Sequence, residues 1–90
     1  MSVLQALIDR DLTELLDDVC RRHHVTRDDV CGRGRTRAVS AARQELWWRL
    51  RNHPTTAFSY LEIGRLFDRN HTTVLFGVRA WEARASPNAA

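Results

Sequence analysis

Two amphipathic helical patterns, separated by only about three residues, lie in the second half of this 90-residue chain. Ser59-Tyr60-Leu61-Glu62 is a capping box, in which Ser59 and Glu62 satisfy the first backbone N–H groups, so a helix is predicted from Ser59 to Asp68. A second, longer helix is predicted from Asn70. The side chains expected in the core are Leu61, Ile63, Leu66 and Phe67 from the first helix and Val74, Leu75, Val78 and Trp81 from the second. Two helices joined by so short a turn indicate a helix-turn-helix.

The rest of the sequence is also helical in pattern, without the alternation typical of strands, so the fold class is predicted to be all-α. One long helix is expected over 2–23, a short one over 27–31 after a weak capping box at Thr26, and a third over 39–52. A flexible basic loop, 32–37, separates the last two. The apolar stripe of the first helix consists of Leu4, Leu7, Ile8, Leu12, Leu15, Leu16, Val19 and Cys20.

Two tryptophans are adjacent in the predicted helix 39–52. Neighbouring residues point about 100° apart on a helix, so Trp47 and Trp48 are not both expected to be fully buried. Trp47 shares its face with Ala42, Leu46 and Leu50, and we assign it to the core. Trp48 is expected at the edge of the core. Together with Phe76 and the acidic first helix, it is a candidate for contact with a partner protein.

The length and composition fit one ordinary soluble domain, expected over residues 1–85 with a frayed tail at 86–90. No apolar run approaches the roughly 18–20 residues needed to cross a bilayer. The N-terminal residues 1–12 contain early acids and no basic segment, so they do not resemble a signal peptide. We therefore expect a cytoplasmic, nucleoid-associated protein that has no membrane partner.

Basic charge is concentrated in one part of the chain. Residues 1–24 hold five acids and three Arg, a net charge of −2, whereas residues 27–51 hold seven Arg and three acids, a net charge of +4. All fourteen basic residues are Arg, whose planar guanidinium suits phosphates and guanine edges, although Arg usage of this kind also follows from a GC-rich genome. A merely solvated face would have more scattered charge. The distribution therefore favours nucleic-acid binding.

Two cysteines and two histidines form a Cys-x2-His-His-x6-Cys pattern from Cys20 to Cys31. It could be drawn as a zinc site, but structural zinc ligands usually come in pairs from two separated knuckles. Cys20 falls on an apolar helix face and Cys31 ends a short apolar run, so buried free thiols are the preferred interpretation. We expect no metal and no cofactor.

A run of short polar side chains opens the last predicted helix. Asn70 is expected to be the N-cap, and His71, Thr72 and Thr73 to form an exposed first turn. Asn pairs with adenine, His and Thr donate or accept hydrogen bonds, and a Thr methyl packs on a thymine methyl. A cap explains one polar residue, whereas four in a row indicate contact with base edges.

These residues resemble a known family. The segment YLEIGRLFDRNHTTVLFGVR at 60–79 is similar to the signature of the C-terminal DNA-binding domain of the bacterial replication initiator DnaA. The resemblance extends back through 25–50 and covers roughly residues 3 to 84. It implies a small helical bundle with a Trp-repressor-like helix-turn-helix, which enters the major groove of duplex DNA while the basic loop reaches the adjacent minor groove.

The resemblance also implies roles for individual residues. The base contacts it implies are Arg35 in the minor groove and Asn70, His71 and Thr72 in the major groove. The phosphate contacts it implies, including backbone N–H groups at the start of the predicted helix 59–68, are Arg33, Arg37, Arg43, Gln44, Arg51, Tyr60, Leu61, Arg69 and Thr73.

The sequence departs from the family pattern in four places. Asn replaces the usual Asp at position 70, the turn at 68–69 is about one residue shorter, and the connection 53–58 is a few residues longer. Nothing resembles the family's ATPase module, since there is no Gly-x-x-x-x-Gly-Lys-[Ser/Thr] phosphate loop, so no nucleotide is expected. The resemblance then implies a stand-alone protein that recognises a DnaA-box-like site.

We therefore expect sequence-specific binding to double-stranded DNA, with an effect on replication initiation or on transcription. The alternative is a protein-interaction adaptor that keeps the fold without base-specific binding. An enzyme is disfavoured, because the histidines are isolated and the carboxylates dispersed, with no recognisable catalytic set.

Overall fold

The computed structural model describes residues 2–85, which form six α-helices and no strand. The helices are α1 (Val3–Asp9), α2 (Thr13–His23), α3 (Arg27–Cys31), α4 (Arg37–Arg51), α5 (Tyr60–Phe67) and α6 (His71–Ala85). The predicted all-α bundle is confirmed. The expected tail at 86–90 lies outside the described residues.

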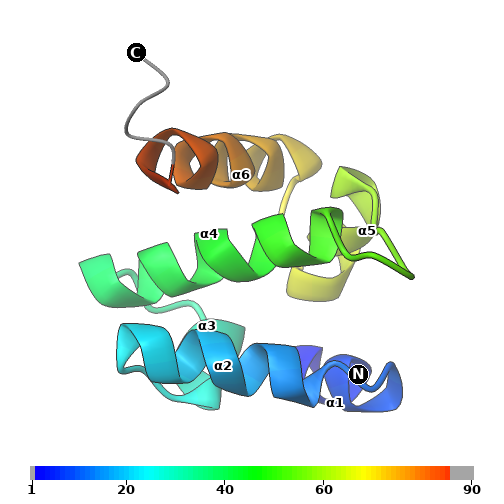
Figure 1. Cartoon of the computed structure of the whole chain (residues 1–90), viewed down its shortest axis with the longest axis horizontal. Coiled ribbons are helices and arrows are strands. Elements are labelled where there is room, and N and C mark those ends of the chain that lie inside the picture. The colour runs from blue at the N-terminus through cyan, green and yellow to red at the C-terminus, as the bar shows by residue number, and fades with distance from the viewer. Residues whose placement is uncertain (1, 86–90) are drawn as a thin grey trace.

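The long helix α4 runs through the middle of the molecule (Figure 1). It has α6 on one side and α2 on the other, and it also packs against α3 and α5. Helix α5 packs against α6, and α1 packs against α3 and α5. The last two helices are therefore held against a frame made by the first four.

The prediction of one long helix over 2–23 is wrong. The chain breaks between α1 and α2, where Asp11 adopts a left-handed conformation with φ 58°. Asp is one of the few non-glycine residues that tolerate this conformation, so the break needs no Gly or Pro. The backbone N–H of Leu12 donates to the carbonyl of Leu7 at 2.9 Å, which closes the turn. The break lets α1 reach α5 while α2 lies along α4.

Helix starts follow the local capping chemistry. The capping boxes at Thr26 and Ser59 are both present with their reciprocal hydrogen bonds, so α3 and α5 begin as predicted. Helix α4 begins at Arg37, two residues earlier than predicted, because the Thr36 hydroxyl accepts from the backbone N–H of Val39 at 3.2 Å. The loop before α4 is correspondingly shorter.

The core lies between α4 and its neighbours. Trp47 is only 4% exposed and packs edge-to-face on Phe67 with ring centroids 5.8 Å apart, whereas Trp48 is half-buried, as predicted. Leu61, expected in the core, is instead 50% exposed. Phe58, which had no predicted role, is buried. Three other residues expected in the core are only half-buried: Leu66, Leu75 and Trp81.

Two glycines mark very close approaches. A Cβ added to Gly77 on α6 would lie 2.7 Å from Cε3 of Trp47 on α4. A Cβ on Gly64 in α5 would lie 2.6 Å from the backbone carbonyl oxygen of Arg69 in the following turn. Real Cβ atoms do not approach so closely, so any side chain at either position would push α6 away from α4 or from α5.

A buried carboxylate links α2 to α4. Glu45 is 1% exposed and lies 2.7 Å from Nε2 of His23, 3.0 Å from Nη1 of Arg22 and 3.4 Å from Nε of Arg49. A buried charge is tolerated when it is paired and hydrogen-bonded; the guanidinium groups of Arg22 and Arg49 supply the opposite charge, and the ring of His23 supplies a further hydrogen-bond partner. This cluster joins the end of α2 to the middle of α4, and the sequence pattern gave no indication of it.

The described helices include none that is both long enough and apolar enough to span a membrane. Within residues 2–85, no group of three or more His, Cys, Asp or Glu side chains is arranged to hold a metal ion. Cys20 and Cys31 are free thiols; Cys20 is buried, as the preferred interpretation held, whereas Cys31 is only half-buried. Burial raises the pKa of Cys31 to about 11, so this thiol stays protonated at neutral pH.

Candidate nucleic-acid interface

The turn between α5 and α6 has only three residues, Asp68 to Asn70. Asp68 ends α5 in a left-handed conformation with φ 54°. The backbone N–H of Arg69 donates to the carbonyl of Gly64 at 2.8 Å, which satisfies one of the last carbonyls of the helix. The close approach at Gly64 and this hydrogen bond together fix the direction in which α6 begins.

Asn70 caps α6, as predicted. Its Oδ1 accepts from the backbone N–H of Thr72 at 2.9 Å and also from the Thr72 hydroxyl. Both lone pairs of the amide oxygen are therefore in use, and only the Nδ2–H2 group remains to contact DNA. A bidentate pair with adenine needs the oxygen as well, so this geometry favours a base acceptor instead.

The first turn of α6 is open to solvent. His71, Thr72 and Thr73 are all exposed, and the helix N-terminus adds backbone N–H groups that attract anions. The Thr72 hydroxyl donates a hydrogen bond to Asn70, so the methyl group of Thr72 is the part of this side chain that remains for contact with DNA. This surface carries donors, acceptors and a methyl group at the start of an exposed helix.

Arg43, expected to contact a phosphate, has a different position in the structure. It is only 4% exposed, and its guanidinium donates four hydrogen bonds to backbone carbonyls. The acceptors are Val30 at 3.1 Å, Gly34 at 3.1 Å, Asp29 at 3.0 Å and Gly32 at 2.9 Å. Because every acceptor lies in α3 or the loop after it, Arg43 holds the loop in shape, and these four donors are not available to a phosphate.

Burial lowers the pKa of the Arg43 guanidinium. An Arg side chain begins so far above neutrality that it nevertheless stays charged. The four carbonyl dipoles thus surround a cation, which strengthens each hydrogen bond. The loop shape depends on this one side chain.

The basic loop is also tied to the turn before α6. Nη2 of Arg33 lies 2.7 Å from Oδ2 of Asp68, and Nη2 of Arg69 donates to the carbonyl of Gly32 at 3.2 Å. These contacts join residues 35 to 37 positions apart in the sequence. The loop and the start of α6 are therefore neighbours on one surface.

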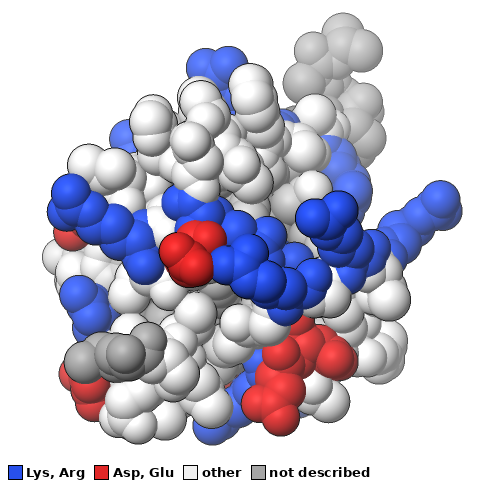
Figure 2. Space-filling view, turned by 180° about the vertical axis from the view of Figure 1, so that it is seen from behind, with Lys and Arg blue, Asp and Glu red and all other residues white. Residues whose placement is uncertain are grey.

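Arg35 lies on the loop, Arg37 is the first residue of α4 directly after it, and both are exposed. Neither makes an ion pair with another of residues 2–85, so both are available to an external anion. Seen from behind the view of Figure 1, Arg side chains form a band across the molecule, and most acidic side chains lie below it (Figure 2). Arg side chains are therefore gathered on this face of the molecule.

The remaining expected phosphate contacts lie near the start of α5. The guanidinium of Arg51 lies 4.9 Å from the ring centroid of Tyr60, which places a cation beside that helix end. The backbone N–H groups of Tyr60 and Leu61 belong to the first turn of α5. Gln44 is half-buried against α6, and its Oε1 has no hydrogen-bond partner among the described residues.

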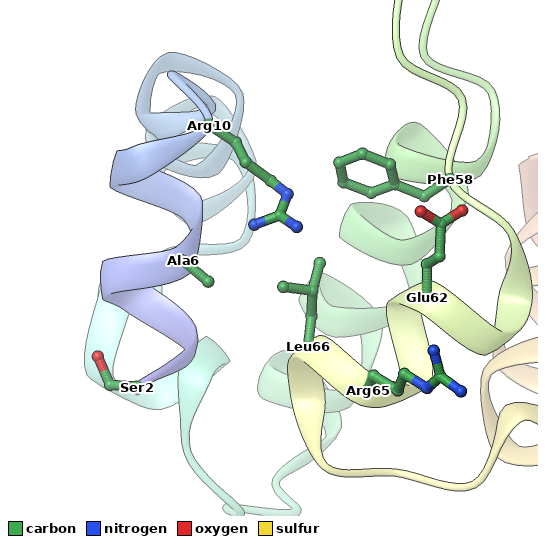
Figure 3. A pocket seen from close by; sticks show the side chains of 7 residues that line it. All are labelled: Ser2, Ala6, Arg10, Phe58, Glu62, Arg65 and Leu66. Atoms are coloured by element: carbon green, nitrogen blue, oxygen red, sulfur yellow. The ribbon is translucent and has the colours of Figure 1, made fainter.

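A shallow groove of about 460 Å³ runs beside the turn and is lined by Leu61, Gly64, Arg65, Asp68, Arg69 and Asn70. A separate cleft of about 370 Å³ lies between α1 and α5 (Figure 3). In that cleft the guanidinium of Arg10 points into the space between the two helices, while Glu62 and Phe58 lie on the opposite wall. None of the expected site residues lines this cleft, so it is not part of the interface.

A helical bundle whose last two helices form a tight turn, with an exposed polar first turn beside an Arg-rich loop, defines a helix-turn-helix domain of the DNA-binding class. Residues 12–80 match the family model described as the bacterial dnaA protein helix-turn-helix. The chain belongs to this family.

Two curated relatives carry the same name. The chain is 39% identical over 64 residues to the chromosomal replication initiator protein DnaA of Bifidobacterium animalis subsp. lactis (strain AD011), and the match covers 70% of this chain. It is 37% identical over 73 residues to the protein of that name from Sphingopyxis alaskensis, a match that covers 80% of this chain. The matches span only 11% and 16% of those proteins. No solved structure matches the chain.

Proposed function

We propose that this protein binds double-stranded DNA sequence-specifically at a DnaA-box-like site, with α6 in the major groove and the loop 32–36 in the adjacent minor groove. The observation that carries the proposal is the direct link between these two elements through the Arg33–Asp68 ion pair and the Arg69–Gly32 hydrogen bond. A rigidly connected pair of elements can contact two neighbouring grooves in a fixed register.

The proposed base contacts are Arg35 in the minor groove and Asn70, His71 and Thr72 in the major groove. Arg33, Arg37, Arg51, Arg69 and Thr73, with Gln44 and the backbone of Tyr60 and Leu61, would contact phosphates. Arg37 stands at the first residue of α4, where a cation is unfavourable to the helix dipole. An anionic partner explains that placement better than helix stability does. Arg43 takes the role of positioning the loop.

The helix-turn-helix of this family is not itself catalytic. We propose a protein of the cytoplasm and nucleoid that occupies sites related to those of the initiator and so affects replication initiation or nearby transcription. An adaptor that contacts a partner protein through Trp48 is less well supported, because Trp48 is half-buried against the core.

A selection of binding sites from random DNA duplexes tests the proposal. We expect enrichment of one short motif with an A·T-rich flank, where Arg35 would enter a narrow minor groove. Recovery of unrelated sequences with equal affinity would contradict sequence-specific binding, and failure to retain any duplex would contradict DNA binding altogether.

The salt dependence of binding should report on the basic loop. Each phosphate contact lowers the slope of log K against log salt concentration by about 0.9, because counterions are released from the duplex. Arg37→Ala should weaken binding to all duplexes about equally and make the slope shallower by about that amount. Fluorescence anisotropy titrations at several salt concentrations measure both quantities.

Arg21→Ala is the matched control for charge. Arg21 is exposed on α2, on the opposite side of α4 from α6 (Figure 1), and its removal changes the net charge by the same amount. We expect the slope to stay unchanged in this variant. If Arg37→Ala and the unaltered protein had the same slope of log K against log salt concentration, Arg37 would not contact a phosphate.

Asn70→Asp should change the preferred base at one position. A carboxylate would still accept from the backbone N–H of Thr72, so the cap should survive, but the amide donor would be lost. The variant should therefore gain preference for a base donor such as the cytosine amino group, by about 1–3 kcal/mol at one base pair. A competition assay over all single-base variants of the selected site, at one salt concentration, measures this change. An equal change for every duplex would mean that Asn70 only caps the helix.

A further inference from the structure

Phe76 on α6 is 63% exposed, which makes it the most exposed large apolar side chain among residues 2–85. A single exposed apolar residue is common on protein surfaces, so exposure alone does not define a site. The position of Phe76 on the helix is what distinguishes it.

Phe76 faces the same way as the first turn of α6. It follows Thr72 by four residues and precedes Arg79 by three, spacings that place all three side chains along one stripe of the helix. The opposite stripe is buried through Val74, Gly77 and Val78. Phe76 therefore continues, one helical turn further along, the surface that holds Thr72.

On α6 itself, the exposed residues around Phe76 are mostly polar and include no acid. Thr72, Thr73, Arg79 and Ala80 are its exposed neighbours on the helix, and α6 contains no acidic residue before Glu82. A protein partner recognised through an aromatic anchor would normally meet a wider apolar patch around it. The major groove, in contrast, presents isolated pyrimidine methyl groups among polar base atoms and lies in a negative potential.

We propose that Phe76 recognises the C5-methyl group of one pyrimidine in the major groove. This inference rests on the proposed DNA-binding function and extends its specificity surface by one helical turn. Thr72 supplies a second apolar group on the same stripe. Its hydroxyl is hydrogen-bonded to Asn70, so its methyl group is the part that can contact a base. The stripe thus combines the amide donor of Asn70 with two apolar groups, and it should favour sites in which C5-methyl pyrimidines lie at neighbouring base pairs.

The test removes one methyl group at a time from the DNA. Each thymine of the selected duplex is replaced in turn by uracil, which keeps base pairing and lacks only the C5-methyl. When the thymine that contacts Phe76 is replaced by uracil, the unaltered protein should bind the duplex about fourfold more weakly, the factor expected when burial of one methyl group is lost. Phe76→Ala should bind the unmodified duplex more weakly and show no further loss at that thymine. Phe76→Leu should retain part of the discrimination.

A second arm identifies the source of the methyl group. With a C·G pair at the same position, 5-methylcytosine should be bound better than cytosine by the unaltered protein and equally by Phe76→Ala. Thr72→Ser, which loses a methyl and keeps the hydroxyl, should lose discrimination at a different thymine. Ile8→Ala removes another exposed apolar side chain, 43% exposed on α1, and should respond to uracil as the unaltered protein does.

If the unaltered protein and Phe76→Ala respond identically to uracil at every position, the inference is overturned while DNA binding stands. If the unaltered protein selects no duplex at all, both the proposed function and this inference are overturned. The two failures are therefore distinct.

Discussion

Trp47→Ala should destabilise the domain by about 3–5 kcal/mol, the range measured for truncating a buried aromatic side chain. Trp47 is 4% exposed, packs on Phe67 and fills the space left by Gly77, so its removal opens a cavity shared by α4, α5 and α6. Small domains are stable by only about 5–15 kcal/mol in total, and most of that margin would be lost. Urea unfolding followed by circular dichroism measures the change.

Two other variants make the comparison specific. Trp48→Ala should cost far less, because that ring is half-buried. Trp47→Phe should cost less than Trp47→Ala, since it keeps most of the ring and removes an Nε1–H that has no hydrogen-bond partner among residues 2–85. A larger loss for Trp48→Ala than for Trp47→Ala would contradict the assignment of Trp47 to the core.

Arg43→Lys should weaken DNA binding about tenfold or more although Arg43 does not face the DNA. A Lys ammonium has three donors at one point and cannot reproduce the planar guanidinium that reaches four separate carbonyls. The loop would lose its shape, and Arg35 would no longer be presented to the minor groove. Stability should also fall, by about 1–3 kcal/mol, because buried carbonyl groups such as that of Val30 would lose a hydrogen-bond donor.

The decisive measurement is the pattern of specificity. If Arg43 positions the loop, Arg43→Lys should flatten preference in the A·T-rich flank as Arg35→Ala does, and leave the major-groove pairs recognised by His71 unchanged. Arg37→Ala, the control at the start of α4 directly after the loop, should lower affinity without changing preference. If the Arg43→Lys variant instead kept its full preference for the A·T-rich flank and its binding depended less on salt, the result would indicate that Arg43 contacts a phosphate.

The helix-turn-helix was predictable because its signals are local. The capping box at Ser59, the short polar break and the cap at Asn70 each act within four residues, and the structure confirms all three. Where tertiary packing decides the end of a helix, prediction from local sequence signals failed. The α1–α2 break at Asp11 is set by where α5 and α4 offer partners, and the apolar stripe of 2–23 continues across it.

The candidate site was predictable in outline and less so in detail. Arg33, Arg35, His71 and Thr72 are exposed, which the roles proposed for them require. Arg43 was assigned to the DNA backbone through the family resemblance alone, which does not show whether an Arg side chain is buried. Only the fold shows that the carbonyls of the preceding loop surround it. Buried Glu45 was missed for the same reason, since its cations come from α2 and from the next turn of α4.

The two glycine contacts have a consequence for how new targets can evolve. Gly64 and Gly77 leave no space between α6 and its neighbours, so the angle and depth at which α6 is presented are not adjustable by small steps. Positions 70 to 73 and 76, in contrast, are exposed and support little of the core. Under the proposed function, substitutions there would exchange one preferred sequence for another with little effect on the core, and those at Asn70 would also have to keep the helix cap. A lineage could therefore diverge in the sites it occupies while the scaffold beneath the contact surface stays the same.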